Sequence, residues 1–284
     1  MDTLGKRLYC IIVITMCVGW VNLALAQETP FAFGVLPQRT PILTAQYWNP
    51  ILNYISTQSG VPLQLKLNKT PPEHEAMIRQ GEFDFIYSNH HFFPWNEAAG
   101  YRVIARPWEA AIRGEIVVLA NSPIHSLAEL QSKEVGFPHR AAFVGYLVTL
   151  DALLKAKIHV QEVIAVGQEG IMGQLKAGRV AAAGVNSQVM RDFAKREKID
   201  YRVLWSSEEY FNIPIVAHPR VPQEKVAAVR AALLHMAHDP VGLQVLTASA
   251  ALIKLDPPYG FVAATDSDYD NIRMFFKHTL VKSH

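Results

Sequence analysis

The sequence predicts an α/β fold with two lobes, each a mainly parallel sheet flanked by helices, and two observations lead to it. First, apolar strand-like runs alternate with helical patterns after residue 27, and this alternation is typical of parallel sheets with covered faces. Second, MIRQGEFDFIYSN (77–89) resembles QLKAGRVAAAGVNS (174–187). Each reads as a helix, a glycine turn, a short apolar strand, and then serine and asparagine. A repeat of this kind indicates two related lobes.

Composition limits the class of protein. Half of the 284 residues are hydrophobic, which is enough for a large core in two lobes. The net charge is +2 and no basic stripe with interleaved aromatic residues occurs, so we expect no nucleic-acid partner. The sequence contains no G-x-S-x-G, H-E-x-x-H, Walker or G-x-G-x-x-G motif. We therefore expect neither an enzyme nor a cofactor.

The first 26 residues read as a secretory signal peptide. Lys6 and Arg7 form its charged start, 8–23 is mostly apolar, and Ala24–Ala26 is a small-residue cleavage site. A membrane anchor is the alternative, but the small residues at the end favour cleavage after Ala26. Both cysteines lie inside this segment, so we expect the mature chain to contain no disulfide and no cysteine metal site. The predicted compartment is a bacterial periplasm.

The first group of expected elements lies between residues 31 and 120. Apolar residues near helical spacing, among them Trp48, Ile51 and Ile55, predict a helix over 43–59, with Trp48 in the core. A second helix opens near Glu73, after two prolines. Short apolar runs predict the strands of this group, which are 31–36, 63–67, 83–87, 101–105 and 115–120.

The second group continues the alternation to residue 237, and the tail after Asp266 reads as helical. Its expected strands are 135–137, 163–166, 180–185, 201–204 and 213–217. Its expected helices are 143–155, 171–177, 188–196 and 225–237. We divide the chain into the signal peptide (1–26), lobe 1 (27–118), lobe 2 (119–212) and a return to lobe 1 with C-terminal helices (213–284).

Polar residues follow one strand in each lobe. In open α/β sheets, ligands bind beyond the carboxyl ends of the strands. If the two lobes face each other, both polar ends line one cleft. Helix capping by Asn89 and Ser187 is an alternative reading that is compatible with this one. The residues at these two ends are Tyr87, Ser88, Asn89 and His90 in lobe 1, and Asn186 and Ser187 in lobe 2.

Five stretches, taken in order, carry a resemblance to a known family. They are FGVLPQRTPILTAQYWNPILNYISTQSGVPLQL, GEFDFIYSNHHF, SPIHSLAELQSKEVGF, AGRVAAAGVNSQVM and VLWSSEEYFNIPIVAHPRVP. With these stretches the chain resembles the periplasmic solute-binding proteins of phosphate, phosphite and phosphonate ABC importers, within the type II periplasmic-binding superfamily. No single motif is decisive, but their order and spacing together are specific. The resemblance covers nearly all of the chain after the signal peptide.

The resemblance implies a two-lobed, hinged fold that closes around a small ligand in the cleft between the lobes. It also implies a periplasmic, monomeric protein that delivers this ligand to an ABC permease in the inner membrane. A membrane histidine kinase, to which the same fold would report ligand occupancy, is the alternative partner.

The chain departs from this family where similar proteins bind the oxyanion. They carry a Ser/Thr-rich run before Gly-Tyr, whereas this sequence reads PHRAAFVGY, with Phe143 among the residues that replace the hydroxyls. Gln168 stands where family members often have histidine, and Ala181 replaces an aspartate. Since a hydrogen bond to a charged group contributes about 1.5–3 kcal/mol, an altered ligand specificity is expected. An uncharged, aromatic or partly apolar ligand, or a non-standard oxyanion, fits these residues better.

The resemblance and the polar strand ends together select the candidate ligand-binding residues. Tyr47 lies where similar proteins place an aromatic residue, and His139 and Arg140 could supply positive charge. The neighbours His90 and His91 are not a metal pair by spacing, but a metal site from His74, His90, His91 and His139 is a further alternative. No bound metal is expected. The full set is Tyr47, Tyr87, Ser88, Asn89, His90, His139, Arg140, Phe143, Gln168, Asn186 and Ser187.

Overall fold

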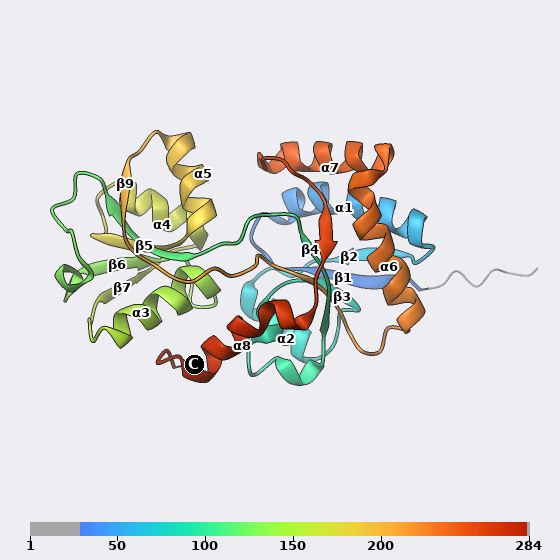
Figure 1. Ribbon diagram of the computed structural model, residues 1–284, viewed down its shortest axis with the longest axis horizontal. Helices are drawn as coiled ribbons and strands as arrows, with labels where there is room; N and C mark the ends of the chain where they lie inside the picture. Colours follow the sequence, from blue (N-terminus) through green and yellow to red (C-terminus); the bar gives the residue numbers. More distant parts are fainter. Residues whose placement is uncertain (1–28, 283–284) are drawn as a thin grey trace, which may run out of the picture.

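The computed structural model describes residues 29–282 of the chain. The predicted signal peptide, residues 1–26, lies outside this part. Two sheets, each flanked by helices, form two lobes (Figure 1), so the predicted two-lobed α/β fold is confirmed. Lobe 1 is the lobe that contains the first strands, and lobe 2 contains the five-stranded sheet.

The sheet of lobe 1 has six strands in the order β11-β4-β10-β3-β1-β2. β1 pairs in parallel with β2 and β3, whereas β10 runs antiparallel between β3 and β4, and β11 runs antiparallel to β4. The sheet is therefore mixed, whereas a mainly parallel sheet was predicted, because β10 and β11 join it antiparallel to their neighbours. The strands are β1 (Phe31–Val35), β2 (Leu63–Lys66), β3 (Phe85–Tyr87), β4 (Arg102–Pro107), β10 (Ile215–Ala217) and β11 (Phe261–Ala263).

The helices of lobe 1 begin and end at residues that suit helix ends. α1 follows Thr40, whose side chain accepts a hydrogen bond from the Leu43 amide, and ends at Gly60 in the left-handed conformation. Trp48 is buried in its core face, as predicted. The helices are α1 (Pro41–Ser59), α2 (Pro71–Arg79), α6 (Gln223–His235), α7 (Pro240–Ile253) and α8 (Asp270–His278).

The sheet of lobe 2 has five strands in the order β7-β6-β8-β5-β9. β6 pairs in parallel with β7 and β8, and β5 runs antiparallel to β8 and β9. The strands are β5 (Gly114–Leu119), β6 (Glu134–Phe137), β7 (Gln161–Ile164), β8 (Ala182–Asn186) and β9 (Tyr201–Ser206). The helices are a π-helix (Phe143–Val148), α3 (Thr149–Lys155), α4 (Gly167–Lys176) and α5 (Ser187–Glu197).

Two extended segments connect the lobes. Because β5 pairs within the sheet of lobe 2, we place the first crossing at 108–113, a few residues before the predicted boundary at 118. The second crossing lies between β9 and β10. An antiparallel bridge between Ile112 and Tyr210 ties the two crossings together.

Several elements differ from the sequence-based expectation. α7 and β11 were not predicted, and β7 begins two residues before the predicted strand at 163–166. The predicted helix over 143–155 is a π-helix that continues into α3. Short 3₁₀ turns were also not predicted, and they comprise His90–Phe92, Glu97–Ala99, Leu127–Leu130, Met236–His238 and Asp266–Tyr269.

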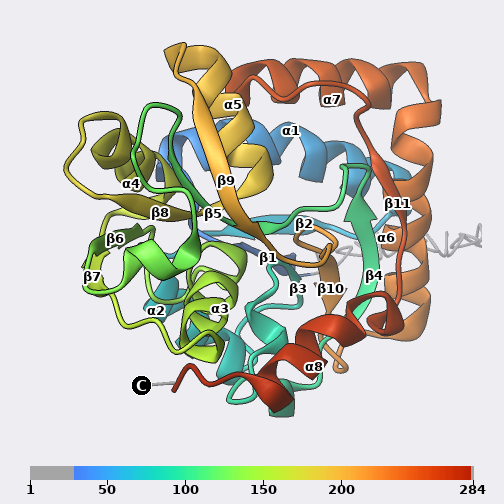
Figure 2. The same cartoon turned by 60° about the vertical axis from the view of Figure 1, so that its left-hand side comes forward.

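One hydrophobic core cluster contains residues of both lobes. Phe92 and Phe93 of lobe 1 belong to it, as do Phe137 and Phe143 of lobe 2. α8 extends from lobe 1 toward α3 of lobe 2 in both views (Figures 1 and 2). Within residues 29–282, no helix is both long and apolar enough to span a membrane.

Candidate ligand-binding site

An aromatic group lies at the carboxyl ends of β1 and β3 in lobe 1. Tyr47 and Trp48 come from α1, and their ring centroids are 5.4 Å apart; the rings of Trp48 and Tyr87 are 4.9 Å apart. Trp48 also packs on Phe33 at 5.2 Å, which holds it in the core. Tyr47 and Tyr87 remain partly exposed beside it. The structure thus brings together two tyrosines predicted to bind ligand.

A carboxylate on the first crossing lies near these tyrosines. Burial raises the pKa of Tyr47 to about 12, and the nearby negative charge of Glu109 adds to this effect. Burial also raises the pKa of Glu109 itself, while a hydrogen bond from the Asn212 side chain to its Oε2 opposes that shift. Sequence reasoning missed Glu109 and Asn212, because neither belongs to a motif and each lies in an irregular crossing segment.

The polar residues after β3 turn into the protein. Ser88 is fully buried, its Oγ accepts a hydrogen bond from the His90 amide, and its carbonyl accepts one from His91 Nδ1 at 3.0 Å. His90 stacks on Phe93, with ring centroids 4.5 Å apart, and its Nδ1 lies 3.4 Å from Glu75 Oε1. These groups therefore form a buried polar layer beneath the carboxyl end of β3.

The helix-capping alternative is wrong for Asn89 and misplaced by one residue in lobe 2. Asn89 makes no capping hydrogen bond, and its Oδ1 is buried without a protein partner. In lobe 2 the cap is Asn186, whose side chain accepts hydrogen bonds from the amides of Gln188 and Val189. The Oγ of Ser187 instead accepts a hydrogen bond from the amide of Arg113 on the first crossing.

The structure does not support the histidine metal site. His74 is buried, and its Nδ1 lies 2.7 Å from the side-chain amide of Asn68, which donates to it. The rings of His74 and His90 are 6.1 Å apart. Within residues 29–282, no group of three or more His, Cys, Asp or Glu side chains is arranged to hold a metal ion.

In lobe 2, the side chain of Gln168 connects the start of α4 to the start of α5. Its Oε1 accepts a hydrogen bond from the amide of Asn186 at 3.2 Å. Its Nε2 lies so close to Gly145 that a Cβ there would be only 2.6 Å away. A glycine at residue 145 therefore makes room for the Gln168 amide, and Gln168, Asn186 and Ser187 lie together at the carboxyl end of β8.

Phe143 and Arg140 were predicted to contact the ligand, but both contact other side chains of the protein. Phe143 is buried, and its ring lies 4.9 Å from that of Tyr210 and 5.3 Å from that of Phe275 on α8. It therefore packs in the core. Arg140 Nη1 donates to the hydroxyl of Tyr146 at 2.6 Å and pairs with Glu162, so its charge already has an acceptor.

His139 brings lobe 2 close to the buried layer of lobe 1. Burial lowers the pKa of His90 well below its ordinary value, and the nearby His74 and His139 lower it further. A hydrogen bond with the backbone of Ala141 has the opposite effect on that pKa. The loop of His139–Ala142 thus lies against His90, so this pair of predicted site residues meets across the two lobes.

Two helix-flanked sheets, joined by two crossings and carrying polar groups at a strand end of each lobe, form the two-lobed fold of a solute-binding protein. The chain belongs to the phosphonate-type periplasmic substrate-binding proteins of ABC transporters. The family model described as "ABC transporter, phosphonate, periplasmic substrate-binding protein" matches residues 33–269. This family is a substrate-binding component of transport systems, so its members act in the periplasm with a small-molecule ligand and an inner-membrane permease.

Solved structures of low sequence identity share the fold. A binding protein component of an ABC phosphonate transporter from Pseudomonas aeruginosa has 18% identity and a TM-score of 0.68, with 87% of this chain and 86% of that chain covered. PhnD1 from Prochlorococcus marinus, in complex with methylphosphonate, has 15% identity and a TM-score of 0.69, with 87% and 97% covered. XAC2383 from Xanthomonas citri, bound to ATP, has 14% identity and a TM-score of 0.70, with 88% and 96% covered. No curated protein sequence gave a significant match.

Proposed function

We propose that this protein binds a small solute between its lobes, at the aromatic and polar groups of the two facing strand ends, and presents it to the permease without chemical change. The observation that carries this proposal is the pair Tyr47 and Tyr87, partly exposed beside the buried Trp48, at the strand ends where α/β proteins bind ligands. Gln168, Asn186 and Ser187 are the corresponding groups of lobe 2.

We propose a ligand other than a simple phosphonate. The residues before Gly145 offer no hydroxyl, and Phe143 fills a core position against α8. Arg140 is engaged with Tyr146 and Glu162, so it is a poor substitute for the missing donors. Methylphosphonate is bound by the Prochlorococcus protein, and this chain lacks the hydroxyl-rich run by which a similar loop would hold it.

We further propose that the protein is exported, cleaved after Ala26, and acts as a monomer with an ABC permease. The pattern of charged start, apolar stretch and small-residue exit supports cleavage. Intact mass of the exported protein should correspond to a chain that begins at Gln27. No observation within residues 29–282 favours the alternative partner, a membrane histidine kinase.

A thermal-shift screen of the exported protein tests the proposed function. The panel contains phosphate, phosphite, alkylphosphonates, sulfonates, and neutral, aromatic and cationic solutes. A ligand that binds only the folded state stabilises it by about 2.7 kcal/mol at a hundredfold excess over Kd, so melting should shift upward for at least one class. Tyr47→Phe and Tyr87→Phe should reduce that shift, whereas Tyr201→Phe, a matched change in β9, should not. If no solute stabilises the protein, the proposal is wrong.

A further inference from the structure

A small cavity lies between the loop that follows β1 and the loop that follows β2, at the start of α1. Its volume is about 20 Å³, which accommodates one water-sized group. The buried residues Val35, Thr44 and Asn68 line it, and so do the exposed residues Arg39 and Lys69. Because part of the lining is exposed, a small group of a solute can reach the cavity from outside.

Two buried polar side chains of this cavity have no protein partner for one of their polar atoms. Thr44 and Asn68 are each 6% exposed. Oδ1 of Asn68 is buried without a hydrogen-bond partner, and the hydroxyl of Thr44 bonds to no group within residues 29–282. The other end of the Asn68 amide is engaged, because it lies 2.7 Å from His74 Nδ1. Since leaving buried polar groups unsatisfied is costly, these two side chains indicate that the cavity receives a polar ligand group.

The charge of the lining favours an anion. Arg39 and Lys69 line the cavity, and none of the described residues that line it is acidic. Within the described part of the chain, neither side chain has an ion-pair partner. Two carboxylates are nearby but lie outside the lining: Glu73 accepts a hydrogen bond from the backbone amide of Lys69, and Glu109 lines a separate cavity with Trp108. The cavity itself therefore presents two positive charges that no lining carboxylate neutralises.

The start of α1 adds to this preference. α1 has no acidic residue in its first turn, whereas α2 carries Glu73 in its own. The positive end of the α1 dipole is therefore not compensated by a side chain of that helix, and a bound anion would compensate it. Thr44 belongs to this end of the helix, so its hydroxyl can donate to an anion in the cavity.

Asn68 can also act as a donor toward the cavity. If its side-chain amide turns by 180°, the bond to His74 is kept, because an imidazole Nδ1 can donate as well as accept. The amide nitrogen of Asn68 then takes the place of the unpartnered Oδ1. An anionic oxygen in the cavity would thus meet two buried donors, with the two cations around it.

Size and shape favour a carboxylate over a tetrahedral oxyanion. A volume of about 20 Å³ accepts one oxygen, and the second oxygen of a carboxylate would remain outside, within reach of the exposed Arg39 guanidinium. Guanidinium groups bind carboxylates through two parallel hydrogen bonds. A phosphonate has a third oxygen, which would need a further donor that this lining does not supply.

We propose that this cavity, lined by Arg39, Thr44, Asn68 and Lys69, is a carboxylate subsite, so that the solute bound by this protein is a carboxylic acid. The inference rests on the proposed solute-binding function and names the class of its ligand. Thr44 precedes Tyr47 by three residues on α1, and residues at this spacing are neighbours on one helix face, so the subsite adjoins the aromatic group.

The subsite also accounts for the altered loop of lobe 2. That loop offers no hydroxyl before Gly145, and its Arg140 is paired with Glu162. The two free cations of the lobe 1 cavity would supply the anion recognition that this loop has lost.

Matched pairs of solutes that differ in one group test the inference. We would measure by calorimetry at pH 7.5 the binding of benzoate against benzamide and against phenylphosphonate, and of propionate against propionamide. Benzoate should bind at least tenfold more tightly than benzamide and than phenylphosphonate, and propionate more tightly than propionamide. Arg39→Gln and Thr44→Val should each reduce the preference for benzoate over benzamide at least threefold. The matched controls are Arg179→Gln, an exposed arginine of lobe 2, and Thr57→Val, an exposed threonine of α1, and both should leave the preference intact.

The melting temperature without ligand shows whether each variant is folded. If Thr44→Val is unstable, Lys69→Gln replaces it, because that side chain is exposed. Equal binding of benzoate and benzamide, or a preference that survives every one of these variants, would overturn the inference and leave solute binding intact. Phenylphosphonate that binds as tightly as benzoate would overturn the assignment to carboxylates. If none of these probes binds, the inference is overturned as well, whereas the proposed function fails only if the wider thermal-shift panel also gives no response.

Discussion

At the scale of single residues, the buried polar layer under β3 holds histidines without charge. His74, His90 and His91 are 0%, 1% and 4% exposed. Burial lowers the pKa of His74 and of His91 to about 3, and lowers that of His90 well below its ordinary value. A protonated imidazole in this layer would lose its hydration, so all three rings are neutral near pH 7.

These histidines should make the protein sensitive to mild acid. In the unfolded chain a histidine titrates near 6.5, so between about 3 and 6.5 the unfolded state binds more protons, and stability falls as pH falls. Between pH 7.5 and 5.5 the loss should be about 1.4 kcal/mol for each histidine, measured by urea unfolding at pH 7.5, 6.5 and 5.5. His91→Gln should flatten this dependence, whereas the exposed His125→Gln should not. Equal stability at all three pH values would contradict the prediction.

Gly145 gives a second prediction at this scale. A Cβ at this residue would lie 2.6 Å from Gln168 Nε2 and 3.0 Å from a carbon of Pro138. Gly145→Ala should therefore displace Gln168 from Asn186 and cost about 1–3 kcal/mol, measured by urea unfolding. Gly173→Ala on α4 is the control, because nothing lies within 4 Å of its Cβ, and it should be stabilising by about 0.5–1 kcal/mol. Similar effects of the two substitutions would show that the packing at Gly145 is looser than described.

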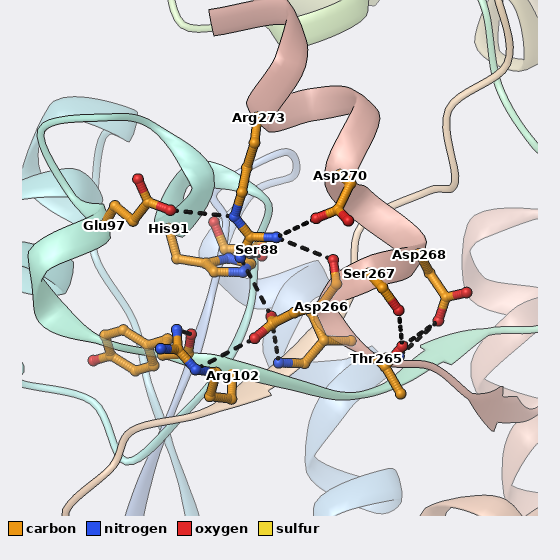
Figure 3. A network of polar contacts seen from close by, with 12 residues as sticks. Ser88, His91, Glu97, Arg102, Thr265, Asp266, Ser267, Asp268, Asp270 and Arg273 are labelled. Carbon is orange, nitrogen blue, oxygen red and sulfur yellow. Dashed lines mark hydrogen bonds and ion pairs between the residues drawn. The ribbon is translucent and has the colours of Figure 1, made fainter. Parts of the chain in front are cut away.

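At the scale of elements, α8 is held to lobe 1 by charge and to both lobes by aromatic rings. Arg273 bonds to the carboxylates of Glu97 and Asp270 and to the carbonyl of Asp266 (Figure 3). Its guanidinium also lies 4.8 Å from the ring centre of Phe92. Beyond α8, the amide of Leu280 donates to a carboxylate oxygen of Asp151 on α3. The C-terminal segment thus connects the two lobes at one flank.

The packing of Phe143 against α8 predicts that Phe143 and Phe276 are energetically coupled. Phe143→Ala should cost about 3–5 kcal/mol, because the ring is buried against Tyr210 and α8. Phe276→Ala, which removes contacts to Phe93 and Phe143, should cost less, since this ring is only partly buried. In a double-mutant cycle by urea unfolding, the two changes should interact by at least about 0.5 kcal/mol. Additive effects, as expected for Phe143→Ala with the exposed Met274→Ala, would contradict a direct contact.

Elements with strong local patterns were predictable, and elements that depend on distant partners were not. α1 shows helical spacing, a threonine cap and a terminal glycine, so its sequence alone identifies it. α7 is apolar on several sides, with Val241 and Leu243 exposed, and its pattern therefore gives no clear buried face. β11 has three residues and exists by pairing with β4, which no local pattern encodes.

The residues of the candidate site also divide into those that the local sequence predicts and those that depend on distant partners. The strand-end residues Tyr87 and Asn186 could be selected because their positions after apolar runs are visible in the sequence. Glu109 and Asn212 come together only because two crossings, 103 residues apart in the chain, run side by side. The burial of Phe143 depends on α8, which follows it by more than a hundred residues, so its role in packing could not be read locally.

At the scale of the whole molecule, the two lobes have separate sheets but share one hydrophobic core cluster. Strands β3 and β4 of lobe 1 and strands β5 and β6 of lobe 2 all contribute buried side chains to one cluster. α8 and the tail after it close that cluster on one flank, while the crossings tie the lobes through the bridge of Ile112 and Tyr210. Any movement of the lobes would therefore pivot near these contacts and open on the opposite side.

This shared core predicts that the two lobes unfold together. Far-UV circular dichroism reports on both sheets. In a Trp205→Phe variant that begins at Gln27, and so lacks Trp20, the fluorescence of Trp48, Trp95 and Trp108 reports on lobe 1 and the crossing, because Trp205 lies in β9 of lobe 2. The two signals should give one coincident urea transition, since a core that spans both sheets cannot lose one lobe and keep its packing. In Phe143→Ala combined with Phe276→Ala, the link is weakened and the transitions should separate. Two transitions in the unaltered protein would mean that the lobes fold independently and that α8 adds little to their coupling.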